Sequence, residues 1–544
     1  MPRSRLLSII QRIAKDRQIA AHKNVSLETV AEWRAEEAGQ RRRSGFTRRE
    51  ILAGGAAAAA TMMLPRCSRA ATQPTIAIVG GGIAGLSCAL QLADNGLAST
   101  VYEANFRLGG RMHTNFSYFN EGQTSEWCGE LIDTNHKTIR TLAKRFGLDV
   151  VDIKAAEPNG SEDTFYFFGQ YYSRDQANND FQAVHHELSD TLQAARYPTT
   201  YNNSTPGGRA LDNTSVYGWI EQHVPGGHSS PMGALLDVAY TEEYASDTRV
   251  QSSLNLIYLL AFNASPGNFE IFGSSDERYH IAGGNQQLPN AIASYLGVGS
   301  TIQTGWQMTA IARNPDGRFT LTFVVGSSVK TVVADYVVMC IPFAILRDLD
   351  YSRAGFDALK DLDIRTLGAG KTGKLQLQFT GRVWNQIGPW PGVSNGNSYA
   401  DTGYQNTWDV TRGQPGRSGI MVDFTGGPVS ESLTTNVPYA FADTAGVLTD
   451  ARRFLECIGP VFPNLEAAWN GKVASSVPHL DPFLKLSYSY WKVGQYQTIA
   501  GYESVRQGNC LFAGEHTSIN FQGFMEGGAF SGQRAANEIL TDLK

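Results

Sequence analysis

The feature that most constrains this fold is a glycine-rich loop between a short apolar strand and a helix. Residues 75–79 form a β-branched apolar run typical of a buried strand, and residues 80–85 read Gly-Gly-Gly-Ile-Ala-Gly, which fits the pattern G-x-G-x-x-G. Apolar residues then recur at helical spacing over 86–93, and a second apolar run over 99–102 ends at Glu103. This order of strand, glycine loop, helix, strand and acid predicts a dinucleotide-binding unit.

Each part of this unit has an expected task. We expect Gly80 to make the tight turn, Gly82 to let the backbone approach a pyrophosphate, and Gly85 to let the helix pack closely on the strand. The helix N-terminus would face the phosphates, and Glu103 would accept hydrogen bonds from ribose hydroxyls. Without the flanking strands and acid, the same glycines would indicate only an ordinary loop.

Composition excludes several classes of function. The chain has 544 residues and 42% hydrophobic residues, enough to bury a large core. Its net charge of −5 provides no global basic field, so we expect no nucleic-acid partner. The six cysteines form no C-x-x-C and the ten histidines no H-E-x-x-H, so we expect neither a metal site nor a disulfide scaffold.

The N-terminal segment differs from the rest in charge. Residues 1–70 carry a net charge of +8 (14 Lys and Arg against 6 Asp and Glu), which leaves −13 on residues 71–544. Arg48-Arg49 precede an apolar Ala/Gly-rich run over 51–64, which is shorter than the ~20 residues that cross a bilayer. A small-x-small step follows at 68–70. The segment resembles a twin-arginine export signal, and we expect a periplasmic or extracellular protein that meets the export machinery transiently. The alternative is an alanine-rich helix of the mature fold.

The residues after the second strand extend the pattern. Residues 103–111 read Glu-Ala-Asn-Phe-Arg-Leu-Gly-Gly-Arg and fit E-x-x-x-R-x-G-G-R. This extension resembles the flavin-dependent amine oxidase superfamily, which includes monoamine oxidases, polyamine oxidases and L-amino acid oxidases. The resemblance implies that Gly110 and Arg111 hold the pyrophosphate of FAD. Asn105 departs from it, because many members have a second arginine there.

The resemblance covers the chain from about residue 74 to the end. Residues 126–133 look like the family's D/E-x-G-G segment near the flavin, with Cys128 in place of a glycine and Gly129 retained. By the same resemblance, Met308 offers its backbone to the adenine. Near the C-terminus, Glu515 would contact the ribityl or phosphate region. Met525 would present a backbone N–H to the flavin pyrimidine at a helix start, where negative charge is stabilised.

Three positions resemble the groups around the reacting amine. Lys374, ten residues before Trp384, resembles the lysine that holds a water against flavin N5. Tyr496 and Phe524 resemble the two aromatic residues that flank the amine. Gln495 stands where some members carry a covalently linked cysteine, so we expect non-covalent FAD. Taken alone, the lysine would be a solvated charge and the aromatics ordinary core residues.

Recognition of the substrate carboxylate is less direct. Snake-venom-type L-amino acid oxidases bind it through the arginine of a G-P-M-R step, which reads Cys-Gly-Glu-Leu here at 128–131. Arg278 and Arg412 are candidate replacements, although either could be a surface charge. Three acids could meet a cationic side chain or amine: Glu130, Glu270 and Asp276.

The expected fold class is α/β plus α+β. It comprises a Rossmann-like FAD-binding domain of the GR2 type and an interleaved substrate domain of mixed sheet and helices. The expected ranges are 71–134, 281–345 and 500–544 for the FAD domain, 135–280 and 346–499 for the substrate domain, and 1–70 for the export signal and extension.

The resemblance implies oxidative deamination of an L-amino acid, with basic substrates favoured. Hydride transfer to flavin N5 would produce an imine, then a keto acid, ammonia and, with oxygen as acceptor, hydrogen peroxide. The alternatives are a primary-amine or polyamine oxidase, a quinone-linked amino acid dehydrogenase, and a flavin-bearing binding protein without turnover. We also expect a homo-oligomer.

Overall fold

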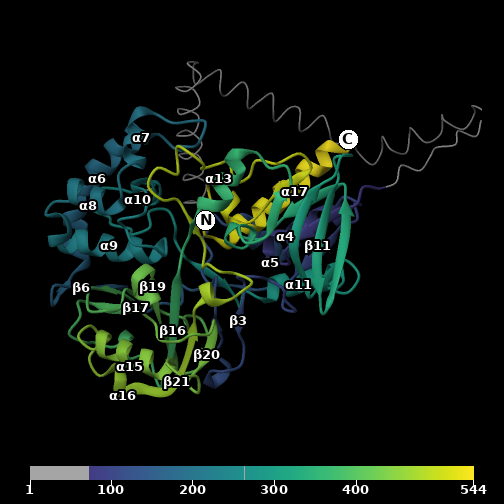
Figure 1. The fold of residues 1–544 in the computed structure, drawn as a ribbon. Helices are drawn as coiled ribbons and strands as arrows, with labels where there is room; N and C mark the ends of the chain where they lie inside the picture. The colour runs from purple at the N-terminus through teal and green to yellow at the C-terminus, as the bar shows by residue number, and fades with distance from the viewer. Residues whose placement is uncertain (1–72, 263) are drawn as a thin grey trace, which may run out of the picture. The chain divides into compact units, whose positions relative to one another are not determined.

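The computed structural model describes residues 73–262 and 264–544 (Figure 1). The expected export signal lies outside these residues. Within the described ranges, no helix is long and apolar enough to cross a membrane, and the cysteines carry free thiols.

A five-stranded parallel sheet forms the centre of the nucleotide domain, in the order β23-β13-β1-β2-β9. Its strands are β1 (Ile76–Val79), β2 (Thr100–Glu103), β9 (Ile302–Thr304), β13 (Tyr336–Met339) and β23 (Cys510–Phe512). Every residue of β1 is buried, as expected for a parallel strand covered on both faces. The predicted strand, glycine loop, helix and strand are therefore present, with α4 over Ile83–Asp94.

The two faces of this sheet have different covers. Successive strand residues point to opposite faces, so Ile76 and Ile78 pack in a core with helices, and Ala77 and Val79 in a core with a second sheet. The helices are α4, α5 (Lys137–Arg145), α11 (Gln287–Leu296) and α17 (Met525–Asp542). The second sheet has the order β12-β11-β10-β14, with β10 (Trp306–Arg313), β11 (Phe319–Val325), β12 (Ser328–Ala334) and β14 (Asp350–Arg353).

Helices α4 and α17 approach each other closely because glycines lie at their contact. A Cβ on Gly532 would lie 2.1 Å from the carbonyl oxygen of Ala84, and one on Gly528 would lie 2.9 Å from Cγ2 of Ile83. Any side chain at Gly532 would force the helices apart. The contact brings the first turns of both helices to one place.

The second domain is built on an eight-stranded mixed sheet in the order β20-β21-β16-β19-β18-β17-β6-β7. Its strands are β6 (Ser161–Phe167), β7 (Gln170–Tyr172), β16 (Thr372–Phe379), β17 (Val393–Ala400), β18 (Asn406–Asp409), β19 (Gly419–Gly426), β20 (Tyr439–Phe441) and β21 (Trp469–Ser476). A helical layer lies beside it in Figure 1: α6 (Arg174–Ala195), α7 (Pro206–Asp212), α8 (Val216–His223), α9 (Pro231–Glu243) and α10 (Ser253–Leu260). Of these, α9 packs against β6, β17, β18 and β19.

Shorter elements complete the described chain. The remaining helices are α12 (Phe343–Leu346), α13 (Ala358–Thr366), α14 (Gly427–Glu431), α15 (Val447–Ile458) and α16 (Leu465–Ala468). Two-stranded pairs are β3 (Thr114–Asn115) with β4 (Ser125–Glu126), β5 (Val150–Asp152) with β8 (Tyr279–Ile281), and β15 (Gly368–Ala369) with β22 (Ser489–Tyr490). The strands of the parallel sheet come from three separate parts of the chain, within the ranges expected for the FAD domain.

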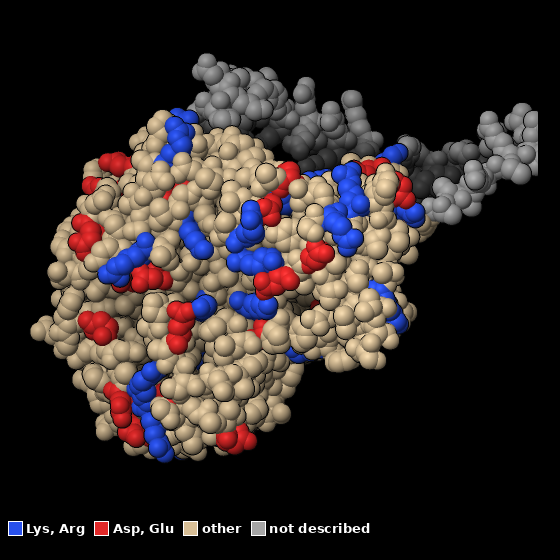
Figure 2. Space-filling view, viewed as in Figure 1, with Lys and Arg blue, Asp and Glu red and all other residues tan. Residues whose placement is uncertain are grey.

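The surface carries charges of both signs. In the face drawn in Figure 2, lysine and arginine side chains lie next to aspartate and glutamate side chains.

The fold class predicted from the sequence, mixed α/β, is confirmed by the sheets and helices described above.

Candidate active site

A cavity of about 690 Å³ lies between the parallel sheet of the nucleotide domain and the eight-stranded sheet of the second domain. On one side it is lined by residues at the carboxyl ends of the parallel strands: Gly80 after β1, Glu103 at the end of β2, Cys340 after β13 and Gly514 after β23. On the other side it is lined by Lys374 of β16 and by neighbouring residues of β18 and β19. The carboxyl edge of an open parallel sheet is where ligands bind in α/β folds.

The glycine loop has the geometry expected of it. Gly80 has a φ of +108° and donates its N–H to the carbonyl oxygen of Tyr102 at 2.8 Å. A Cβ on Gly85 would lie 2.0 Å from the carbonyl oxygen of Gly80, so Gly85 packs beneath the loop and does not line the cavity. Gly82 and Gly110 both line the cavity, and a Cβ on Gly110 would lie 3.4 Å from the Cα of Gly82. The backbone is thus exposed to a ligand, at the first turn of α4.

Glu103 lies beside this loop. Its carboxylate accepts hydrogen bonds from the backbone N–H of Gly81 at 2.6 Å and of Asn105 at 2.7 Å. Burial raises the pKa of the Glu103 carboxyl, and these two donors oppose the rise. Each oxygen retains a lone pair that can accept from a hydroxyl. The backbone at Gly81 and Asn105 therefore orients this acid.

Arg111 and Glu515 are brought together on the opposite wall. The Arg111 guanidinium donates from one nitrogen to Glu515 at 2.8 Å and to the carbonyl oxygen of Ser487 at 2.9 Å, which leaves three of its five N–H donors for a ligand. Glu515 also accepts from the Ser489 hydroxyl at 2.8 Å and the Gly523 N–H at 2.9 Å. Burial alone would raise the pKa of Glu515, but Arg111 and these donors hold it below its usual value.

The first turn of α17 completes the cofactor side. Met525 and Gly129 line the cavity, and a Cβ on Gly129 would lie 3.1 Å from Cγ of Met525. A side chain at Gly129 would therefore press on the Met525 side chain and on the carbonyl oxygen of Arg111, 3.3 Å from the same Cβ. These features together fit a flavin nucleotide with a pyrophosphate. The N-termini of α4 and α17 and the exposed glycine backbone can face the phosphates, Glu103 can accept from a ribose, and Arg111 has free donors for an anion.

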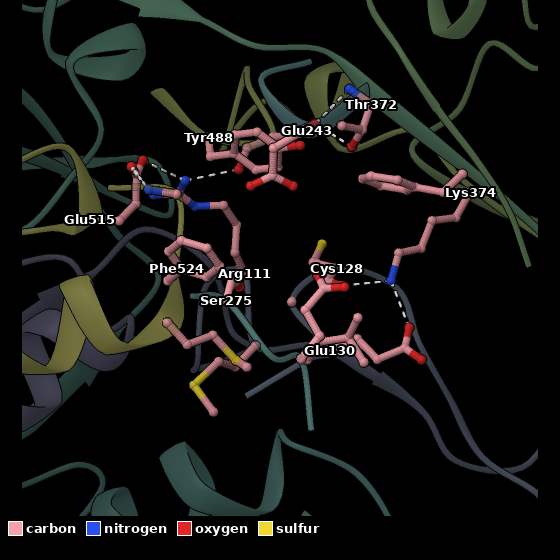
Figure 3. A pocket seen from close by; sticks show the side chains of 18 of the residues that line it. Arg111, Cys128, Glu130, Glu243, Ser275, Thr372, Lys374, Tyr488, Glu515 and Phe524 are labelled. Atoms are coloured by element: carbon pink, nitrogen blue, oxygen red, sulfur yellow. Dashed lines mark hydrogen bonds and ion pairs between the residues drawn. The ribbon is translucent and has the colours of Figure 1, made fainter. Parts of the chain in front are cut away.

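Lys374 is buried in β16 and held by the segment after β4. Its ammonium donates to the carbonyl oxygen of Cys128 and to the carboxylate of Glu130, both at 2.9 Å, and lies 3.5 Å from the carbonyl oxygen of Glu126 (Figure 3). Glu130 also accepts from the indole N–H of Trp408 at 2.9 Å. The three ammonium donors thus have protein acceptors, the third a weak one. The prediction that Lys374 holds a water remains a prediction.

The aromatic pair differs from the expected one. Phe524 lines the cavity as predicted, but Tyr496 does not. The Tyr496 ring packs in the core against Trp491, and its hydroxyl donates to the side-chain oxygen of Asn255 at 3.0 Å. Tyr488 lines the cavity instead, near Phe524 in Figure 3. The assignment of Tyr496 as a flanking aromatic residue is corrected to Tyr488.

The same correction applies to the neighbouring residue. Gln495 does not line the cavity; its side chain donates to the carbonyl oxygen of Thr366 at 2.8 Å and accepts from the N–H of Lys492 at 2.9 Å. The residue before Tyr488 is Ser487.

An acidic group that the sequence reasoning missed lines the same cavity. It consists of Glu242, Glu243 and Glu277. Their side chains make no hydrogen bond or ion pair with any described residue, although Glu242 is only 2% exposed. Figure 3 shows Glu243 pointing into the space around which Tyr488, Phe524 and Lys374 lie. Burial raises the pKa of all three carboxyls, that of Glu277 to about 7.

The other candidate residues have separate fates. Arg278 pairs with Asp152 at 2.6 Å and does not line the cavity. It is therefore withdrawn as a candidate for binding the substrate carboxylate. Arg412 lines the cavity and pairs with Glu157 at 2.6 Å. The predicted acids Glu130, Glu270 and Asp276 all line the cavity. The side chain of Met308 is buried in β10 and does not line the cavity, and its predicted backbone contact with adenine remains a prediction.

Comparison with known families gives one match along most of the chain. The model of the family described as flavin-containing amine oxidoreductase matches residues 83–540. Polyamine oxidase 6 of Oryza sativa subsp. japonica is 25% identical over 504 residues, covering 88% of this chain and 92% of that protein. The L-amino-acid oxidase of Sistrurus catenatus edwardsii is 24% identical over 494 residues, covering 85% and 86%.

Solved structures share the fold. Cyclohexylamine oxidase from Brevibacterium oxydans IH-35A superposes with a TM-score of 0.71 at 19% identity, covering 87% of this chain and 99% of that one. Wild-type putrescine oxidase bound to putrescine has a TM-score of 0.69 at 16% identity, covering 86% and 99%.

Proposed function

Because this chain belongs to the flavin-containing amine oxidoreductase family, we propose that it catalyses the FAD-dependent oxidative deamination of a basic L-amino acid. The observation that carries the choice of a substrate with a second cationic group is the acidic group of Glu242, Glu243 and Glu277, which line the cavity without a partner among the described residues. Glu242 is buried, and the other two are half-buried. Burial disfavours an unpaired carboxylate, and a substrate with a second positive charge would supply the missing partner.

The bound flavin would supply the two-electron acceptor for the carbon that carries the amine. Tyr488 and Phe524 provide apolar walls that fix the amine and exclude water. The ion pair of Lys374 and Glu130 anchors the segment from Glu126 to Glu130 against β16. The cavity thus has an aromatic wall with the acidic group next to it: the Tyr488 hydroxyl donates to the carbonyl oxygen of Glu242 at 2.9 Å.

Arg412 is the candidate residue for binding an α-carboxylate of the substrate. Of the two candidate arginines, it is the one that lines the cavity, and its contacts with Glu157 and with the carbonyl oxygen of Asp409 occupy two of its five donors. The free donors can bind a carboxylate. Replacing Arg412 with Met should raise KM for L-arginine and leave the KM of agmatine, which lacks the carboxylate, unchanged.

A di- or polyamine oxidase is the second candidate. The acidic group would serve such a substrate equally well, and the ion pair between Arg412 and Glu157 already neutralises the arginine that a carboxylate would need. The family relatives include polyamine oxidases as well as L-amino-acid oxidases.

Anaerobic mixing of the purified yellow protein with matched substrates tests these choices. The panel is L-arginine and L-lysine, their decarboxylated counterparts agmatine and cadaverine, and uncharged L-norleucine. Bleaching of the oxidised flavin by the amino acids but not by the decarboxylated amines supports the proposal, and the reverse pattern supports the second candidate. If none of them bleaches the flavin, both are refuted and a binding protein without turnover is favoured.

Four further parts of the proposal have simple tests. We propose that oxygen reoxidises the flavin to give hydrogen peroxide; peroxide release in air, without an added quinone, distinguishes an oxidase from a dehydrogenase. We propose non-covalent FAD, because the residues before Tyr488 and Tyr496 are Ser487 and Gln495, and neither is a cysteine; denaturation and filtration should then release all the flavin. We also propose twin-arginine export and a homo-oligomer. Replacing Arg48 and Arg49 with lysine should retain the protein in the cytoplasm, and size-exclusion chromatography with light scattering measures the oligomer.

A further inference from the structure

A reciprocal clasp joins residues 133–134 to residues 275–277. The carboxylate of Asp133 accepts from the backbone N–H of Glu277 at 2.9 Å and from the hydroxyl of Ser275 at 2.8 Å. In return, Thr134 donates its N–H at 2.7 Å and its hydroxyl at 2.5 Å to the carboxylate of Asp276. The two segments are thus held in one register by four hydrogen bonds.

The clasp determines where Glu277 lies. Glu277 has a φ of +43°, in the left-handed region that side-chain-bearing residues rarely adopt. Such a conformation persists only where the surroundings impose it, and here the N–H of Glu277 is bound by Asp133. Asp133 is 3% exposed and does not itself line the cavity, whereas Glu277 does. Asp133 therefore acts on Glu277 from behind the cavity wall, through the hydrogen bond to its N–H and through its negative charge, which raises the pKa of Glu277.

The Glu277 carboxyl is placed to receive a cation. No lysine or arginine among the described residues lies within ion-pair distance of it, although Lys154 and Arg412 line the same cavity. Glu242, which is nine-tenths buried and also without a partner, adds a second carboxyl to the same cavity wall. A site built to pair a charge rejects an analogue that lacks it, because the buried group then stays unpaired.

We propose that Glu277 is a specificity-determining residue that selects substrates with a second cationic group, and that Asp133 is the positioning residue that holds it in place. This inference rests on the proposed function, because it assumes a substrate with two cationic groups. It adds two residues to that function: Glu277, which pairs with the second cationic group of the substrate, and Asp133, which holds Glu277 in position.

The test compares kcat/KM for a substrate with two cationic groups and for its counterpart with one: L-arginine against L-norleucine, or putrescine against n-butylamine if the enzyme oxidises amines. Glu277→Gln should lower the ratio of the two kcat/KM values at least tenfold, through KM of the substrate with two cationic groups, and leave kcat of the substrate with one cationic group unchanged. Glu277→Gly should lower the ratio equally while retaining the flavin, because glycine adopts the left-handed backbone without strain. Asp163→Asn is the matched control: Asp163 also lines the cavity but lies 3.7 Å from Arg174 and accepts a hydrogen bond from Asn395 at 3.0 Å, so the ratio should change less than twofold.

Asp133→Ala should lower the ratio of the two kcat/KM values as Glu277→Gln does. The double variant Asp133→Ala with Glu277→Gln should have the same ratio as Glu277→Gln alone. A ratio within twofold of the wild type in both Glu277 variants would overturn the assignment of Glu277. A further loss in the double variant would overturn the positioning role of Asp133. If the wild type itself shows no preference for the substrate with two cationic groups, the proposed function fails; a preference that survives in the Glu277 variants refutes this inference alone.

Discussion

Replacing Glu130 with glutamine removes one charge from the buried pair that holds Lys374 in β16. The two charged groups lie 2.9 Å apart, and their side chains are 6% and 8% exposed. At an effective dielectric constant of about 20, the attraction at this distance is roughly 6 kcal/mol, most of it offset by the cost of desolvating both groups. Removal of one partner from a buried pair costs about 3–5 kcal/mol, because the other charge stays buried and unpaired.

We therefore expect Glu130→Gln to lower the stability of the holoprotein by about 3 kcal/mol, the lower end of that range, because the amide oxygen can still accept from Lys374. Globular proteins unfold with an entropy of about 2.1 cal/mol/K per residue, so in a chain of this size 1 kcal/mol corresponds to roughly 1 °C in Tm. The expected fall in Tm is about 3 °C. Differential scanning calorimetry of the flavin-loaded protein measures it.

A double-mutant cycle isolates the pair. In Glu130→Gln combined with Lys374→Met no buried cation remains, so the combined loss should be smaller than the sum of the single losses by about 2 kcal/mol. The matched control is Lys371 with Glu431, an ion pair whose side chains are 45% and 48% exposed; its coupling should stay below about 1 kcal/mol. Coupling below about 0.5 kcal/mol for Glu130 and Lys374 would refute the reasoning, since independent sites add within that margin.

Three further outcomes are expected. Gly85→Ala should yield protein without yellow flavin absorbance, because the new Cβ would lie 2.0 Å from the carbonyl oxygen of Gly80. Gly381→Ala, with open space around it, should retain the flavin. Equal flavin content in both variants would contradict the role of the loop. Burial raises the pKa of Glu126 to about 8, above its unfolded value near 4.3, so its stabilising effect is full below about pH 4.3 and is lost as the pH rises towards 8. Glu126→Gln should therefore gain in Tm relative to the wild type between pH 5 and 8, and a constant difference would contradict this. Arg111→Gln leaves Glu515 buried without its cation, so its pKa should rise and flavin affinity should fall at least tenfold as measured by flavin fluorescence titration; unchanged affinity would show that Arg111 does not hold the cofactor.

Much of the cofactor side could be predicted from the sequence, because its signals are local. A glycine that must have positive φ or accept close backbone contact, such as Gly80 or Gly85, shows its role within one strand, loop and helix. Glu103 ends the next strand, and Met525 begins a helix after a recognisable glycine-rich bend. These short-range constraints need no knowledge of distant contacts.

The substrate side was decided by the tertiary structure. Glu242, Glu243 and Glu277 come from the end of α9 and from a loop before β8, and no local pattern distinguishes them from surface acids. Tyr488 and Tyr496 lie eight residues apart beside similar motifs, and packing alone directs one ring into the cavity and the other into the core. Burial and the absence of a partner are properties of contacts between segments far apart in the chain. The amino-acid sequence by itself therefore determined the nucleotide-binding unit, and only the folded arrangement decided which side chains surround the substrate.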